Sequence, residues 1–108
     1  MTVASLAEAM GLTPLALPEP DREIRGGYCG DLLSWVMGRA GADNAWITIM
    51  SNINIIAVAS LADVACVLLA ENVTVGEEVV KTANEKGVNL LSSPLGTYEL
   101  AVRLSKTI

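Results

Sequence analysis

The stretch that decides the fold comprises an apolar segment, CVLLA at Cys66–Ala70, then TVGEEVVKTANEKG at Thr74–Gly87, then a second apolar segment, VNLLS at Val88–Ser92. Short, fully apolar segments are typical of strands that are buried on both faces of a sheet. Thr74 and Glu77 have the spacing of a capping box and Gly87 favours a helix end, so the middle segment predicts a helix. Strand, helix and strand in this order predict two parallel strands joined by a helical crossover.

The same alternation continues on both sides of this unit. Alternating apolar and polar residues predict a strand at Trp46–Met50, and the nearly all-apolar Asn54–Ala59 predicts another, reached by a hairpin-like step. Ser60 is placed to cap a short helix through Ala65, and Thr97 opens a last helix that runs to about Lys106. These elements predict an α/β domain with a mixed, largely parallel sheet flanked by helices.

The first third of the chain predicts two helices and two extended segments. Thr2 caps a helix that Gly11 ends, and Leu12–Leu17 predicts an edge strand because its prolines cannot donate to a ladder. Ile24–Cys29 is expected to be extended, and Asp31 is expected to be the N-cap of a helix at Leu32–Met37. The side chains expected to pack in the interior include Leu32, Leu33, Val36, Met37, Trp46, Cys66 and Tyr98.

Length and composition limit the classes of protein that fit. The 108 residues suit one domain over positions 1–108, and 52% of them are hydrophobic, which is enough for a real core. No stretch has the ~20 apolar residues that a membrane span requires, and Met1–Met10 lacks the features of a signal peptide, so we expect a cytoplasmic protein. A net charge of −5 without a basic stripe argues against nucleic-acid binding. Two distant cysteines and no histidine argue against a zinc site, and no cofactor is implied. A disulfide between them is not expected in the cytosol.

The segment from Arg25 to Asp31 is the first candidate site. Its glycines, Gly26, Gly27 and Gly30, stand on either side of Tyr28 and just before the expected helix, where backbone N–H groups can receive an anion. Arg25 would add positive charge, whereas the carboxylate of Asp31 would cap the same donors and repel an anion. The alternative is a tight strand-to-helix turn that requires glycine for its backbone conformation.

Two further strand ends and two single residues are weaker candidates. Ser51, Asn52 and Asn54 follow one expected strand, and Ser92 and Ser93 follow another, where sheets often bind ligands. Their structural alternatives are a polar turn and helix capping. Trp35 is a candidate interface residue, since an exposed tryptophan often marks one. Cys29 lacks a histidine that would activate it as a nucleophile.

A family resemblance rests on the string DREIRGGYCGDLLSWVMGRA at Asp21–Ala40 followed by WITIMSNINIIAVASLADVACVLLAE at Trp46–Glu71. Together with VNLLSS at 88–93 and TYELAVRL at 97–104, these motifs resemble the DRTGG domain family over nearly the whole chain from about Leu6. Arg25 stands where a threonine often precedes the two glycines. Such domains occur alone, beside CBS modules and in phosphotransacetylases, and they are similar to the N-terminal domains of HPr kinase/phosphorylase and of Mur ligases.

The resemblance implies a small three-layer α/β domain with no catalytic activity of its own. The kinase chemistry of HPr kinase belongs to another domain, and this chain lacks that domain's G-x-x-x-x-G-K-[ST] phosphate loop. We therefore expect a non-catalytic regulatory module that senses a small molecule or nucleotide, or binds a protein partner, and forms a homodimer. Standalone copies suggest a link to carbon or hydrogenase-linked redox metabolism. The alternatives are a structural adaptor in a larger assembly, or a phosphoryl or acyl transferase acting at the glycine segment.

Overall fold

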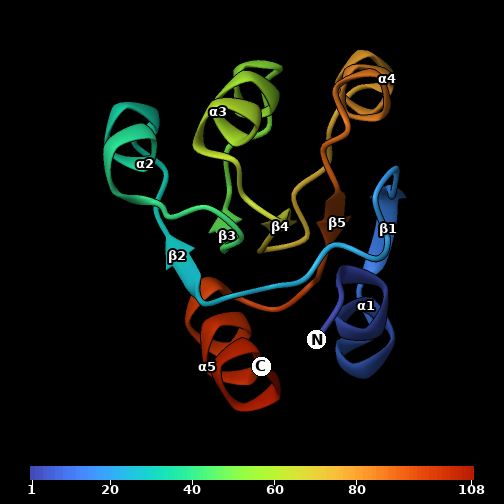
Figure 1. Cartoon of the computed structure of the whole chain (residues 1–108), viewed down its shortest axis with the longest axis vertical. Helices are drawn as coiled ribbons and strands as arrows, with labels where there is room; N and C mark the ends of the chain where they lie inside the picture. The colour runs from blue at the N-terminus through green and yellow to red at the C-terminus, as the bar shows by residue number, and fades with distance from the viewer.

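A computed structural model describes all residues 1–108 and contains one five-stranded sheet with helices on both faces (Figure 1). The strand order is β1-β5-β4-β3-β2; β1 is antiparallel to β5 and all other neighbours are parallel. In chain order the elements are α1 (Val3–Met10), β1 (Thr13–Ala16), β2 (Gly27–Cys29), α2 (Leu33–Arg39), β3 (Ala45–Thr48), α3 (Asn54–Ala62), β4 (Cys66–Leu69), α4 (Glu77–Lys86), β5 (Leu90–Ser92) and α5 (Thr97–Thr107).

The helices form two layers, with α2, α3 and α4 on one face of the sheet and α1 and α5 on the other (Figure 1). The central strands β3 and β4 are buried at every position, which explains why their sequences lack polar alternation. Each face has its own core of 14 buried residues, one around Leu68, Leu91 and Leu100 and the other around Trp46 and Leu69. The predicted three-layer, mixed and largely parallel α/β fold is therefore confirmed. No helix is long and apolar enough to cross a membrane.

A long connection between β1 and β2 passes along the amino ends of the parallel strands, from one border of the sheet to the other (Figure 1). Asn89 is 1% exposed; its amide donates to the carbonyls of Glu19 and Ala65 and accepts from the N–H of Glu19. Arg22 forms ion pairs with Asp43 at 3.1 Å and Asp63 at 2.8 Å. Burial alone lowers the pKa of Arg22, but its hydrogen bonds to these two carboxylates raise it. The connection is thus fastened to the start of β3, β4 and β5.

Several elements expected from the sequence are confirmed. The first helix is capped by the Thr2 hydroxyl and ends at Gly11, and the proline-containing strand lies at an edge. The strand after Cys66, the helix ending at Gly87 and the last helix are also present. Both thiols are free.

The prediction of a strand at Asn54–Ala59, followed by a helix that Ser60 caps, is wrong. This segment is the helix α3, with Ser60 inside it, and no hairpin joins it to β3. Exposed Asn54, Ala57 and Ser60 alternate with buried isoleucine, valine and alanine at the three-residue spacing of a helix. The reason is topological: β3 and β4 are parallel neighbours, so the chain must cross back between them, and a helix makes that crossover. The mixed character of the sheet comes from β1 instead.

Three smaller predictions are also wrong. The hydroxyl of Thr74 does not cap α4, whose N-cap is Gly76. Leu32 and Met37 are exposed, because α2 lies at the border of the sheet and buries only Val36 fully. Tyr98 is 85% exposed, since it lies two residues before the buried Leu100 and therefore on the opposite side of α5.

Candidate functional site

The glycine segment forms a turn into the border strand β2. Gly26 has a left-handed backbone with φ of 84°, and its carbonyl accepts from the N–H of Ala45. Gly30 donates its N–H to Ile47, and its carbonyl accepts from the indole N–H of Trp46 at 2.9 Å. The N–H of Gly30, one of the donors expected to bind an anion, therefore already has a partner in the sheet, as the alternative of a tight turn implies.

Asp31 does not cap α2, contrary to the prediction from the sequence. The N-cap position belongs to Leu32, and no side chain caps this helix. One carboxylate oxygen of Asp31 accepts from the Thr48 hydroxyl at 2.8 Å and from the N–H of Ile49 at 2.9 Å. The side chain thus joins the carboxyl end of β2 to the carboxyl end of β3.

A cavity of about 390 Å³ lies between β2 and α5. It is lined by Gly26, Gly27, Tyr28 and Cys29 on one side and by Ala101, Leu104, Ser105 and Ile108 on the other. A Cβ atom at Gly27 would lie 3.1 Å from the Leu104 side chain, so glycine at this position allows α5 to approach the strand. Three residues of the predicted site thus line a cavity together with Cys29, whereas Arg25, Gly30 and Asp31 do not. No feature of the sequence indicated that α5 forms the second wall of this cavity.

The two thiols differ in environment, and neither is activated. Partial burial raises the pKa of the Cys29 thiol, and the nearby charge of Asp31 raises it further. Burial raises the pKa of Cys66 to about 12, with a small opposing effect of Arg22. Both side chains are therefore protonated at neutral pH, where a thiol is a poor nucleophile.

The other two candidate segments lie along the carboxyl edge of the sheet, as expected. Asn52 accepts from the N–H of Asn54 and so forms a turn that begins α3, while Ser51 is exposed. Ser92 ends β5, and the Ser93 hydroxyl accepts from the N–H of Leu95. These bonds match the structural alternatives of a polar turn and a helix-entry cap. Asn54 lines a cavity, but that cavity lies between α3 and α4 and includes no residue of a strand.

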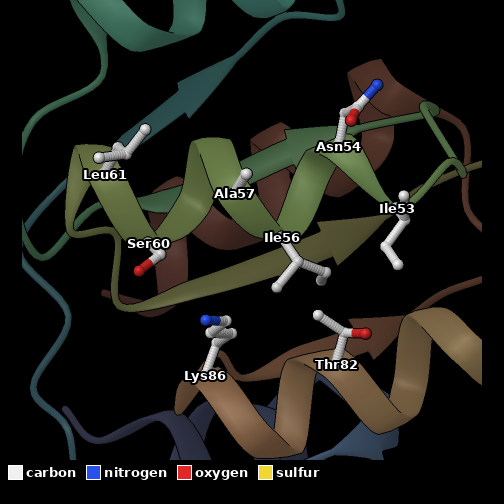
Figure 2. A pocket seen from close by; sticks show the side chains of 8 residues that line it. All are labelled: Ile53, Asn54, Ile56, Ala57, Ser60, Leu61, Thr82 and Lys86. Carbon is white, nitrogen blue, oxygen red and sulfur yellow. The ribbon is translucent and has the colours of Figure 1, made fainter.

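This cavity, of about 330 Å³, opens between α3 and α4 (Figure 2). Figure 2 shows Ile56 pointing into the gap between the helices, with Ser60 on α3 and Lys86 on α4 across the gap from each other, while the Thr82 hydroxyl points away from Lys86. Ile53, Asn54, Ala57 and Leu61 complete the lining. The Thr82 hydroxyl donates to the carbonyl of Glu78, and the ammonium group of Lys86 has no carboxylate within ion-pair distance. The only signal for this site in the sequence was the spacing of Thr82 and Lys86, which places both on one face of a helix.

Large apolar side chains are exposed at several places on the surface. Trp35 is 53% exposed, as predicted for an interface residue, and the guanidinium of Arg39 lies 3.7 Å from its ring centre. Leu61 and Tyr98 are more exposed still. An exposed tryptophan is typical of interfaces, although a cation over its ring also stabilises it locally.

Comparison with known proteins identifies the family. No curated protein sequence matches the chain. Among solved structures, it is similar to the CBS and DRTGG domains of the regulatory region of Clostridium perfringens pyrophosphatase, in complex with the activator diadenosine tetraphosphate, with a TM-score of 0.72 and 12% identity. The alignment covers 95% of this chain but 45% of that one, so the likeness concerns the fold of part of that region. The model of the DRTGG domain matches residues 33–107. The chain therefore belongs to the DRTGG domain family, as its sequence motifs indicate.

Proposed function

We propose that this DRTGG domain is a non-catalytic regulatory module that senses a small ligand in the cavity between α3 and α4 and acts as a homodimer. The observation that carries the ligand-sensing proposal is the combination, in one cavity, of an apolar floor at Ile56 with the Lys86 ammonium and the Ser60 hydroxyl. Its volume of about 330 Å³ lies within the range of small-molecule sites. The pyrophosphatase region of similar fold binds a nucleotide activator, which supports a nucleotide as the first class to test.

The chemistry of the lining favours a ligand with an apolar or aromatic body and one anionic group. Ile53, Ile56 and Leu61 offer apolar contact, and the Ser60 hydroxyl can accept and donate hydrogen bonds. The Thr82 hydroxyl donates its proton to Glu78 and can only accept. An ammonium group without an ion-pair partner attracts one negative charge, and a second cation is absent from the lining. A nucleoside monophosphate or an acyl phosphate fits this pattern better than a polyphosphate does.

The arrangement of polar side chains favours binding over catalysis. Neither cavity is lined by an aspartate or a glutamate, and the Cys29 thiol in the cavity beside β2 is held in its protonated form. General acid–base catalysis and nucleophilic catalysis most often use a histidine, a carboxylate or an activated thiol beside the reacting atoms. Lys86 and Ser60 could also take such roles, but they line the cavity between α3 and α4 and not the glycine segment. A phosphoryl or acyl transferase acting at the glycine segment is therefore the weaker proposal.

A thermal-shift screen with nucleotides, acyl-CoA species and phosphosugars tests the ligand. A ligand at about 100 times its Kd stabilises the fold by about 2.7 kcal/mol, which for 108 residues raises Tm by about 12 °C. We expect Lys86→Ala to abolish most of the shift. The matched control is Lys81→Ala, because Lys81 is on the same helix but outside the cavity and is 80% exposed.

The screen has two other informative results. A shift that Lys86→Ala leaves intact places the ligand elsewhere and refutes this site. A flat response to every compound refutes ligand sensing within these classes and favours the structural adaptor, for which the exposed Trp35 and Leu61 would supply contact surface.

A further inference from the structure

We propose that two copies of this chain associate through the free edge of β2, pairing antiparallel about a two-fold axis at Tyr28, so that the two sheets become one. This inference rests on the proposed homodimer and adds its interface; it does not depend on the ligand.

The hydrogen-bonding groups of β2 are divided between its two edges. The carbonyl of Gly26 accepts from Ala45, and the N–H of Gly30 donates to Ile47, so the even-numbered residues face β3. In a parallel ladder alternate residues face alternate sides, so the N–H and C=O groups of Gly27 and Cys29 point away from the sheet. Border strand β2 therefore offers two donors and two acceptors to a second strand, and no partner within the chain occupies that side.

The opposite border of the sheet, strand β1, is protected against pairing with another chain. Strand β1 contains Pro14, and its pairing shifts register between Pro14 and Ala16. Prolines and irregularities of this kind prevent a sheet from pairing with another chain. Strand β2 has no proline, no bulge and no lysine, and its outward residues Gly27 and Cys29 are exposed. Only one of the two borders of this sheet is therefore open to pairing.

A two-fold axis at Tyr28 uses all four outward groups. Gly27 then lies opposite the partner's Cys29, and Cys29 lies opposite the partner's Gly27, which gives one hydrogen-bonded pair on each side of Tyr28. Gly27 has no side chain, so the partner's Cys29 meets no Cβ opposite it. Two-fold pairing is self-complementary, as an isologous interface requires.

Charge complementarity supports the same register. Arg25 is three residues before Tyr28 and Asp31 is three residues after it, so the two-fold axis places the arginine of one copy at the same end of the strand pair as the partner's aspartate. Both residues are exposed, and the guanidinium of Arg25 has no carboxylate partner within its own chain. Only one oxygen of the Asp31 carboxylate is used within the chain, by Thr48 and Ile49. Like charges would instead meet if two arginines lay opposite each other, which an axis at residue 25 would require.

The cavity beside β2 would lie at this junction. Its walls include Ala101, Leu104 and Ile108 of α5, and Ile108 is 43% exposed. In the continuous sheet the α5 helices of the two copies come together on one face, where these apolar side chains would cover each other. Burial of apolar area at the junction adds to the four backbone hydrogen bonds.

Light scattering after size exclusion is the first test, at micromolar concentration. We expect a dimer for the wild type and for Cys29→Ser, and a monomer for Cys29→Lys, because lysine on an edge strand opposes pairing. Arg25→Glu should raise the Kd of the dimer about fivefold, from the loss of two exposed ion pairs. Circular dichroism establishes that each variant is folded.

The register is tested by cross-linking. In the proposed register Tyr28 lies opposite the partner's Tyr28 and forms a non-hydrogen-bonded pair with it. The Cα atoms of such a pair are about 4.5 Å apart, a distance that a disulfide can span. Tyr28→Cys in a Cys29→Ser background should therefore form a covalent dimer on mild oxidation, whereas Leu61→Cys in the same background, an exposed control, should not. A monomeric wild type refutes the homodimer itself. A dimer that survives Cys29→Lys and resists cross-linking at position 28 refutes only the β2 interface.

Discussion

The side chain of Asn89 offers the sharpest test of how the long connection is held. Replacing Asn89 with alanine removes three hydrogen bonds: those at 2.9 and 2.8 Å to the backbone of Glu19, and the one at 3.0 Å to the carbonyl of Ala65. A hydrogen bond contributes about 1 kcal/mol to stability, so the loss should be about 3 kcal/mol. For a domain of 108 residues, whose unfolding free energy is typically about 5–15 kcal/mol, this is a large fraction.

Urea denaturation measures the loss. With a slope of about 2 kcal/mol per molar urea, the midpoint should fall by about 1.5 M without a change of slope. The matched control is Asn84→Ala, because Asn84 is an exposed residue of α4 and alanine favours helices, so its stability should be unchanged or slightly higher. A loss below about 1 kcal/mol for Asn89→Ala would mean that water or a shifted backbone replaces these bonds, and the account of the connection would be wrong.

Three other substitutions test the environments described above. In the native protein, Cys66 should resist an aromatic disulfide reagent, while Cys29 should react slowly at mildly alkaline pH. Asp31→Asn should speed the reaction of Cys29, because removing a negative charge lowers the pKa of the Cys29 thiol and raises its thiolate fraction. Gly26→Ala should cost about 1–2 kcal/mol in thermal unfolding, because φ of 84° strains any residue with a Cβ, and an unchanged Tm would contradict that conformation. Arg22→Met should cost about 1–2 kcal/mol, with a smaller loss at high salt; a loss independent of salt would argue against the ion pairs.

The sequence predicted the middle of the sheet well, for reasons that are local. The strand at Cys66 and the helix that ends at Gly87 are specified by residues within a few positions of one another. Asn54–Ala59 was misassigned because a short apolar run has the same composition in a buried strand and in a buried helix. The three-residue spacing of Asn54, Ala57 and Ser60 was present, but the need for a crossover depends on where β3 and β4 pair.

The candidate sites show the same limit. The glycine segment stays a predicted site, and the cavity beside it depends on α5, which begins about 70 residues later, so no local pattern indicates that cavity. Asp31 has the sequence position of a helix cap, but Thr48 and Ile49 in the neighbouring strand take its carboxylate instead. The tertiary partners of Asp31 therefore override the helix-capping role that its position in the sequence predicts.

The division of the sheet between two parts of the chain has a consequence for folding. Both border strands, β1 and β2, come from the first third of the chain, whereas β3, α3, β4, α4 and β5 follow one another without interruption. The contiguous part can form through short-range encounters, which are fast, and β2 joins β3 over a similarly short separation, from Gly27 to Ala45. Strand β1, in contrast, must be closed onto β5 over most of the chain, from Thr13 to Ser92. Substitutions in β4 or β5 should therefore slow folding, while those in the connection fastened by Arg22 should mainly hasten unfolding. In native-state hydrogen exchange the two borders should open before the centre.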